Sequence, residues 1–143
     1  RELIMITFCC FSLSPLSISQ ILIASFLAIC FLQSGIDKII DRKGNLDWLT
    51  GHFSNSPLKN IVPLLLMIIT LSELLGGFLC IVGIFDFLIN GTKLLMLYGF
   101  IINAISLIAL FLGQRLAKDY EGAAVLLGYF ILTIIGILSF SAI

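Results

Sequence analysis

The chain has 143 residues, 60% apolar and only 11% charged, and its eight basic and eight acidic side chains leave no net charge. A length of this order holds one domain, and a water-soluble domain of that size could not bury so much apolar surface. The balanced charge and the lack of a basic stripe argue against nucleic acid as a partner. The composition therefore predicts a protein solvated by the lipid bilayer.

The cysteine and histidine content argues against a metal or dithiol centre. The cysteines Cys9, Cys10, Cys30 and Cys80 form no C-x-x-C pair, and His52 is the only histidine. One histidine cannot hold a haem between two imidazoles and makes a zinc site improbable. Cys30 and Cys80 fall inside apolar segments, where cysteine usually serves as a small buried side chain. We predict no metal site.

Four apolar segments reach the length of about 20 residues that a helix needs to cross a bilayer. They cover 15–36, 61–85, 94–113 and 123–143, and their one formal charge is Glu73. The segments lack the alternation of barrel strands. The predicted fold class is therefore an all-α membrane protein, an antiparallel four-transmembrane-helix bundle formed by a single membrane domain at 15–143.

Helix-start signals agree with these limits. Ser14 before Pro15 has the pattern of an N-cap followed by a first-turn proline, and Asn60 ahead of Pro63 repeats it. The preceding residues, 1–14, combine a short apolar run with serines, as in the end of a signal peptide, but carry only Arg1 as a basic region. We favour a lead-in segment that lies against the bilayer or extends the first helix.

The loop at 37–60 is the longest connection. Asn45 is predicted to cap a short helix that places Leu46, Leu49 and Phe53 on one side, with Trp48 nearby. This pattern favours a helix lying in the membrane interface, where the tryptophan ring is stable. An ordinary folded loop is the alternative.

The crossings also predict an orientation. Asn90-Gly91 is a turn signal, which makes the second and third spans a hairpin. Four crossings then place the loops 37–60 and 114–122 on one side. That side holds Lys38, Arg42, Lys43, Lys59, Arg115 and Lys118, and the other holds Arg1 and Lys93. The positive-inside rule predicts that the two loops are cytoplasmic.

Glu73 is the first candidate functional residue, because a charge at bilayer depth is costly and normally faces the bundle interior. Counting twelve residues from each membrane end puts Glu73 and Asn103 at the same depth, about 18 Å, so we predict a hydrogen bond between them. Glu73 serves either as a proton relay or hydrogen-bond partner for a quinone or lipid-like ligand, or only as a packing contact.

Three stretches occur in order: FLQSGIDKIID at 31–41, SELLGGFLCIVGIF at 72–85 and GQRLAKDYEGAAVLLGYF at 113–130. Together they resemble the bacterial DoxX family of four-helix inner-membrane proteins, over roughly 31–130. The residues that match the family pattern are Lys38, Glu73, Arg115, Asp119 and Tyr120. Some members are subunits of a thiosulfate:quinone oxidoreductase, and most have no settled activity.

The charged residues of this resemblance lie at one membrane face. Lys38 and Arg115 end spans on the same side, and Asp119 follows Arg115 by the four residues that permit a helical ion pair. Tyr120 adds an aromatic interface anchor. These residues form either a polar mouth for an anionic or quinone headgroup, or a belt that pairs with lipid phosphates.

These features predict a protein in contact with the lipid bilayer and with other integral membrane proteins. The sequence contains no soluble domain and no nucleophile–base pair, whereas Ala124, Gly128 and Gly136 form a small-residue stripe suited to helix contacts. We therefore expect an accessory or structural subunit of a larger, respiratory or redox, membrane complex, and not an enzyme. The alternative is a quinone-linked oxidoreductase subunit with a site near Glu73. A lone intramembrane carboxyl and no broken-helix repeat argue against a transporter.

Overall fold

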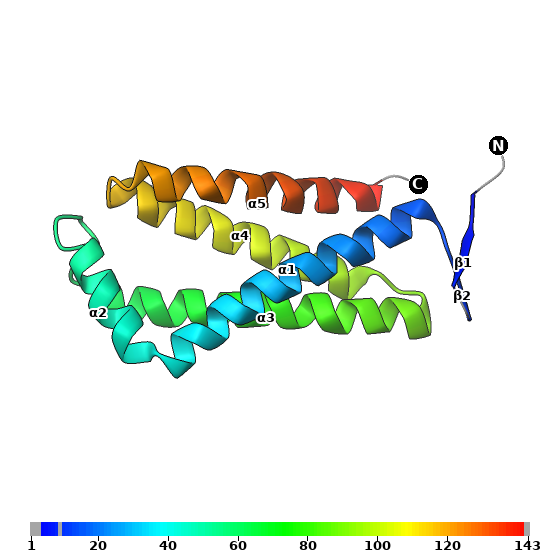
Figure 1. Cartoon of the computed structure of the whole chain (residues 1–143), viewed down its shortest axis with the longest axis horizontal. Helices are drawn as coiled ribbons and strands as arrows, with labels where there is room; N and C mark the ends of the chain where they lie inside the picture. The colour runs from blue at the N-terminus through cyan, green and yellow to red at the C-terminus, as the bar shows by residue number, and fades with distance from the viewer. Residues whose placement is uncertain (1–3, 9, 142–143) are drawn as a thin grey trace.

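A computed structural model describes residues 4–8 and 10–141, and in this part of the chain the architecture is helical (Figure 1). Four helices are long and apolar enough to cross a membrane, and they form the bundle predicted from the sequence. The helices are α1 (Pro15–Ile40), α2 (Arg42–His52), α3 (Val62–Asn90), α4 (Leu94–Leu116) and α5 (Tyr120–Leu138), followed by the 3₁₀ turn η1 (Ser139–Ser141). The chain is a small multi-pass integral membrane protein.

The described N-terminal residues do not extend the first helix, which was one of the two alternatives expected for the lead-in segment. Within the described residues they form an antiparallel hairpin of β1 (Ile6–Phe8) and β2 (Phe11–Leu13), in which Ile6 is opposite Leu13. Pro15 explains the break, because a proline forces the residue before it into extended backbone. Ser14 has ψ 155° and accepts a hydrogen bond from the Ser17 amide, so it is the predicted N-cap. Cys9 lies outside the described residues.

α1, α3 and α4 are longer than the apolar windows predicted for them, because polar residues continue these helices past the hydrocarbon-length segments, whereas α5 ends at Leu138, inside its window. α3 continues to Asn90, where Gly91 ends it with a φ of 74°, as the turn signal predicted. At the other end of α3 the prediction was wrong: Ile61 is the N-cap and makes no side-chain capping bond, so Asn60 has no such role.

The short helix predicted in the first loop is α2, which lies across the end of the bundle (Figure 1). Its N-cap is Asp41, whose carboxylate accepts a hydrogen bond from the Gly44 amide, and not Asn45 as predicted. Asn45 lies inside the first turn and donates back to the Asp41 carbonyl oxygen at 2.9 Å. Asp41 caps the helix because its carboxylate accepts a hydrogen bond from a first-turn amide, which has no partner within the helix.

The bundle core lies where α1 and α4 cross the middle of α3. Leu27, Met96 and Phe100 are fully buried there, whereas large apolar side chains of every span point outward. Such outward apolar faces suit lipid, not water. Gly136 on the inner side of α5 packs against Phe100, which confirms part of the predicted small-residue contact.

The two ends of the bundle differ. At the end that holds the hairpin, α1 and α5 are close, and Gln20 on α1 donates to Ser139 at 3.0 Å. Further along, Phe26 stacks on Tyr129 with ring centroids 6.1 Å apart. Beyond this stack α1 crosses toward α3 and diverges from α5 (Figure 1). The divergence creates the space in which the candidate site lies.

Candidate functional site

Glu73 pairs with Lys38, a partner that the sequence reasoning did not choose. The Lys38 Nζ atom of α1 lies 3.0 Å from Oε2 of Glu73 on α3. Ser34, one turn before Lys38, links the two: its hydroxyl accepts from Nζ at 2.6 Å and donates to Oε1 of Glu73 at 3.1 Å. Glu73 is only 2% exposed. The three side chains therefore form a polar triad between α1 and α3, in which Glu73 is buried and Ser34 and Lys38 are partly exposed.

The geometry of the triad leaves one carboxylate oxygen incompletely satisfied. Oε2 of Glu73 is within ion-pair distance of Lys38, but within the described part of the chain it accepts no aligned hydrogen bond. An ion contact of 3.0 Å does not by itself direct an N–H of Lys38 along a lone pair of Oε2. A buried carboxylate with spare acceptor capacity is costly unless something occupies it.

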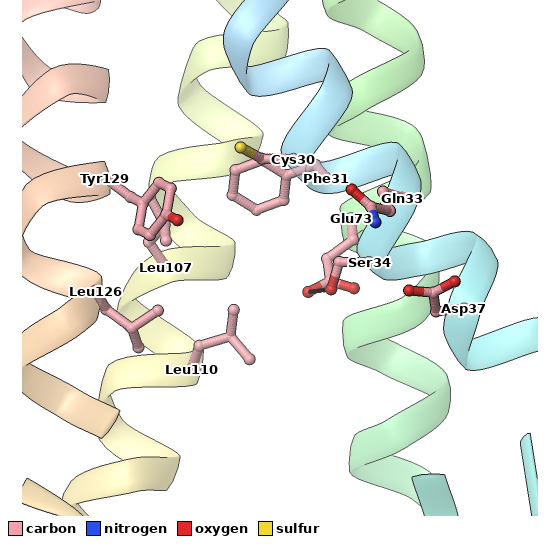
Figure 2. A pocket seen from close by; sticks show the side chains of 10 residues that line it. All are labelled: Cys30, Phe31, Gln33, Ser34, Asp37, Glu73, Leu107, Leu110, Leu126 and Tyr129. Carbon is pink, nitrogen blue, oxygen red and sulfur yellow. Dashed lines mark hydrogen bonds between the residues drawn. The ribbon is translucent and has the colours of Figure 1, made fainter. Parts of the chain in front are cut away.

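The triad borders a pocket of about 380 Å³. Cys30, Phe31, Gln33, Ser34 and Asp37 of α1, Glu73 of α3, Leu107 and Leu110 of α4, and Leu126 and Tyr129 of α5 line it (Figure 2). Polar side chains gather on the α1–α3 side and apolar side chains on the α4–α5 side. This division suits a molecule with a polar head and an apolar body. We refer to this space as the α1–α5 pocket.

The predicted hydrogen bond between Glu73 and Asn103 is wrong. Asn103 is fully buried on α4, and its amide nitrogen instead donates to Cys80 Sγ at 3.4 Å. On the neighbouring turn Ser106 bonds to Ser72 at 2.9 Å. Asn103 is therefore level with residues 76–80 of α3, one turn past Glu73. Counting residues from the loop ends therefore missed the register between α3 and α4, in which Ser72 lies opposite Ser106 and Gly76 opposite Asn103.

Arg115, Asp119 and Tyr120 lie at the α4–α5 turn and do not line the α1–α5 pocket. The predicted ion pair between Arg115 and Asp119 is wrong, because Asp119 is the N-cap of α5 and accepts from the Gly122 amide at 2.9 Å. Arg115 instead lies over the Tyr120 ring, with its guanidinium carbon 4.6 Å from the centroid. Of the six sequence-predicted site residues, the structure brings Lys38 and Glu73 together beside the pocket and Arg115 and Tyr120 together at the α4–α5 turn, away from it.

His52 joins the first loop to this turn. Its Nε2 atom lies 2.9 Å from Gln114 Oε1 and 3.6 Å from Asp119 Oδ2. The imidazole also stacks on Trp48, with centroids 4.6 Å apart. These contacts fix α2 against the α4–α5 corner at the same end of the bundle as the predicted cytoplasmic loops.

A second polar cluster, which we did not predict, lies at the opposite end of the bundle. Lys93, in the connection between α3 and α4, donates to Ser17 at 2.9 Å and to Gln20 at 2.7 Å. Burial lowers the pKa of Lys93 below 10.5, because desolvation disfavours the ammonium form. The cluster ties the α3–α4 turn to the start of α1.

The sequence held a signal for the triad that depth counting missed. Ser34 and Lys38 are four residues apart and therefore share one face of α1. A lysine near a helix end extends its long side chain back along its own helix. Pairing the one intramembrane acid with the nearest basic residue on a neighbouring span would have selected Lys38. The placing of Tyr129 and Leu110 opposite them depends on helix crossing and carried no such signal.

No family model, curated protein or solved structure matches this chain. The resemblance to the DoxX family therefore stays a prediction. Among residues 4–8 and 10–141, no group of three histidine, cysteine, aspartate or glutamate side chains could hold a metal ion.

Proposed function

We propose that this small integral membrane protein binds an amphipathic, lipid-like molecule in the α1–α5 pocket. The observation that carries the proposal is the buried carboxylate of Glu73, which lines the pocket with one oxygen lacking an aligned donor. The apolar residues opposite, Leu107, Leu110 and Leu126, supply a surface for a hydrocarbon or ring. The pocket thus combines a few polar groups with an apolar wall, as small-molecule sites in proteins commonly do.

A pair of pocket variants tests this function. Leu110→Trp fills the pocket, whereas Leu112→Trp places the same ring on the outward face of α4, where Leu112 is 56% exposed. The full chain is extracted in mild detergent, and its bound small molecules are identified by native mass spectrometry. We expect an amphipathic molecule on the wild type and on Leu112→Trp, and its loss from Leu110→Trp. Equal loading of both variants would contradict the proposal.

The quinone suggested by the DoxX resemblance needs hydrogen-bond donors for its carbonyl oxygens. The Lys38 ammonium and the Ser34 hydroxyl donate within the triad, but Gln33 and Tyr129 carry an amide and a hydroxyl on the pocket wall. A membrane subunit of a quinone-linked oxidoreductase is therefore a further candidate. Its test is the same extraction, with bound quinone on the wild type and none on Glu73→Gln as the supporting result.

A second candidate function is an accessory subunit within a larger membrane complex. One observation favours it: a side chain on Gly128 of α5 would meet nothing within 4 Å, and Ala124, one turn earlier, is exposed. Small residues on an outward face let a partner helix approach closely. Stoichiometric co-purification of other membrane proteins, lost on Gly128→Leu, would support this role. A monodisperse preparation without a partner would reject it.

The orientation proposed from the sequence places α2 and the α4–α5 turn in the cytoplasm of a bacterial inner membrane. The support is the excess of Lys and Arg at that end, which Figure 1 shows to be a single end of the bundle. The test is an impermeant maleimide applied to intact cells that express Lys43→Cys or Thr92→Cys, each in a cysteine-free background. Labelling of only Thr92→Cys supports the orientation, and labelling of only Lys43→Cys reverses it.

A further inference from the structure

The buried carboxylate of Glu73 has unused hydrogen-bonding capacity beside the α1–α5 pocket. Its Oε1 atom accepts from the Ser34 hydroxyl, whereas Oε2 lies 3.0 Å from Lys38 Nζ and accepts no aligned hydrogen bond from the described residues. The hydrogen bonds that Lys38 donates go to the carbonyl and hydroxyl oxygens of Ser34. A carboxylate has about four acceptor positions, so Glu73 can accept further hydrogen bonds from a ligand.

The charged side chains around the pocket also favour a cationic ligand. Asp37 lines the pocket at its rim and makes no side-chain hydrogen bond within the described residues, and Glu73 lines it deeper inside. Lys38 is the cation within reach of Glu73, but it is not among the lining residues. Two carboxylates with one ammonium leave a net charge of −1 beside the pocket. An anionic headgroup would be repelled there, and a cationic one attracted.

The aromatic residues complete this chemistry. Phe31 of α1 and Tyr129 of α5 place rings on the pocket wall, and the Tyr129 ring lies beside Leu107, across the pocket from the acidic side chains (Figure 2). The faces of such rings attract cations and also accept apolar groups. A protonated amine attached to a hydrocarbon would thus find carboxylates, ring faces and an apolar wall within one space.

We propose that the α1–α5 pocket selects an amphipathic molecule whose head is a protonated amine, held between the carboxylates of Glu73 and Asp37. The amine supplies the hydrogen bond that Oε2 of Glu73 lacks, and its charge balances the pocket. This proposal rests on the proposed function and narrows its ligand class. An anionic headgroup is not expected in this pocket, whereas the polar mouth considered from the sequence involves Arg115, Asp119 and Tyr120, which lie outside it.

The experiment uses the full chain in phosphatidylcholine nanodiscs, with empty discs subtracted. The probe is radiolabelled decylamine, which is protonated at neutral pH, and unlabelled decanoate is the competitor of the same chain length. We expect decylamine to bind saturably and decanoate to leave it in place at tenfold excess. Displacement of decylamine by an equal concentration of decanoate would overturn the charge preference.

Three acid-to-amide variants locate the interaction. Glu73→Gln should weaken decylamine binding at least about tenfold, because the variant loses the charge-assisted hydrogen bond between the carboxylate and the ammonium group. Asp37→Asn, at the exposed rim, should weaken it about threefold and leaves the triad intact, so it keeps the test valid if Glu73→Gln fails to fold. Asp47→Asn removes the same charge from the exposed face of α2 and should have no effect. Equal affinities in Asp37→Asn and Asp47→Asn would refute the proposal.

The Leu110→Trp variant separates the two proposals. If it abolishes binding of a neutral or anionic amphiphile, the pocket binds ligands but the amine preference fails. If it changes the binding of no amphiphile, the proposed function itself fails. Discs containing phosphatidylethanolamine distinguish the source of the amine: competition with decylamine assigns the site to a lipid headgroup, and its absence assigns it to a free lipophilic amine.

Discussion

Gly83 on α3 and Met96 on α4 approach so closely that a side chain on Gly83 has no space. A Cβ atom there would lie 2.5 Å from the Met96 amide nitrogen and 2.6 Å from its Cα atom. Backbone atoms cannot move aside as a flexible side chain can. The contact therefore holds α3 and α4 at a separation that only glycine permits.

Gly83→Ala should lower the stability of the bundle. The added methyl group forces α3 and α4 apart, and overpacking of this kind costs about 1–3 kcal/mol. The measurement is thermal unfolding in detergent, followed by loss of helical circular dichroism. Gly128→Ala is the matched control, since a Cβ there meets nothing within 4 Å and should leave the midpoint unchanged or raise it. Equal midpoints for the two variants would contradict the close approach.

Lys38 and Glu73 should be energetically coupled. Removing one partner leaves a buried charge without its counterion, which costs about 3–5 kcal/mol in a fully buried pair and less here because Lys38 is 15% exposed. We expect Lys38→Met and Glu73→Gln each to destabilise the protein, and the double variant to be more stable than the sum of the two effects predicts.

The control for this cycle pairs Glu73→Gln with Lys93→Met. Lys93 bonds to Ser17 and Gln20 at the opposite end of the bundle, so these two effects should add within about 0.5 kcal/mol. Additivity in the Lys38–Glu73 cycle as well would mean that the ion pair carries no coupling energy.

Lys93 should give the protein a pH dependence at alkaline pH. Because burial lowers its pKa below 10.5 in the folded state, the folded protein releases this proton before the unfolded chain does. The group therefore opposes folding while it is charged, and stability rises as the pH increases from the lowered pKa to 10.5. The difference in unfolding midpoint between wild type and Lys93→Met, measured from pH 8 to 10.5, should change with pH in this direction. A constant difference would exclude the effect.

His52 should hold the first loop on the α4–α5 corner. His52→Ala removes the contacts with Gln114 and Asp119 and the stacking on Trp48. We expect Trp48, the only tryptophan, to become more accessible to acrylamide quenching of its fluorescence. Lys43→Ala, an exposed position on the same helix, is the control. Unchanged quenching in His52→Ala would show that other contacts fix α2.

The sequence was sufficient for the spans because length and hydropathy alone decide which segments lipid can solvate. Local chemistry predicted the Ser14 cap and the Gly91 turn for a similar reason, since both depend on a few adjacent residues. The predictions were wrong where the outcome depends on the register between two helices, or on whether a side chain caps a helix or makes another contact. Asn103 was assigned one turn too near Glu73, and Asp119 was assigned to Arg115 although it caps α5.

The α1–α5 pocket itself could not be predicted, because it results from the angle at which α1 leaves α5. No residue pattern in α1 indicates that this helix diverges from α5. Leu126 and Tyr129 thus belong to the site only through the packing of four helices. The hairpin at 6–13 was missed for another reason: its apolar residues suit either a strand or a helix, and Pro15 was used only to place the start of α1.

The divergence of α1 from α5 also determines how a ligand would arrive. The pocket between them is lined by residues of the membrane-spanning helices α1, α3, α4 and α5, so we expect a ligand to enter it from the surrounding lipid. Occupancy would then follow the mole fraction of the ligand in the surrounding leaflet, and its nominal concentration in buffer would matter only through partitioning. A longer alkyl tail would raise apparent potency without touching the protein, by about 0.8 kcal/mol of membrane partitioning for each added methylene.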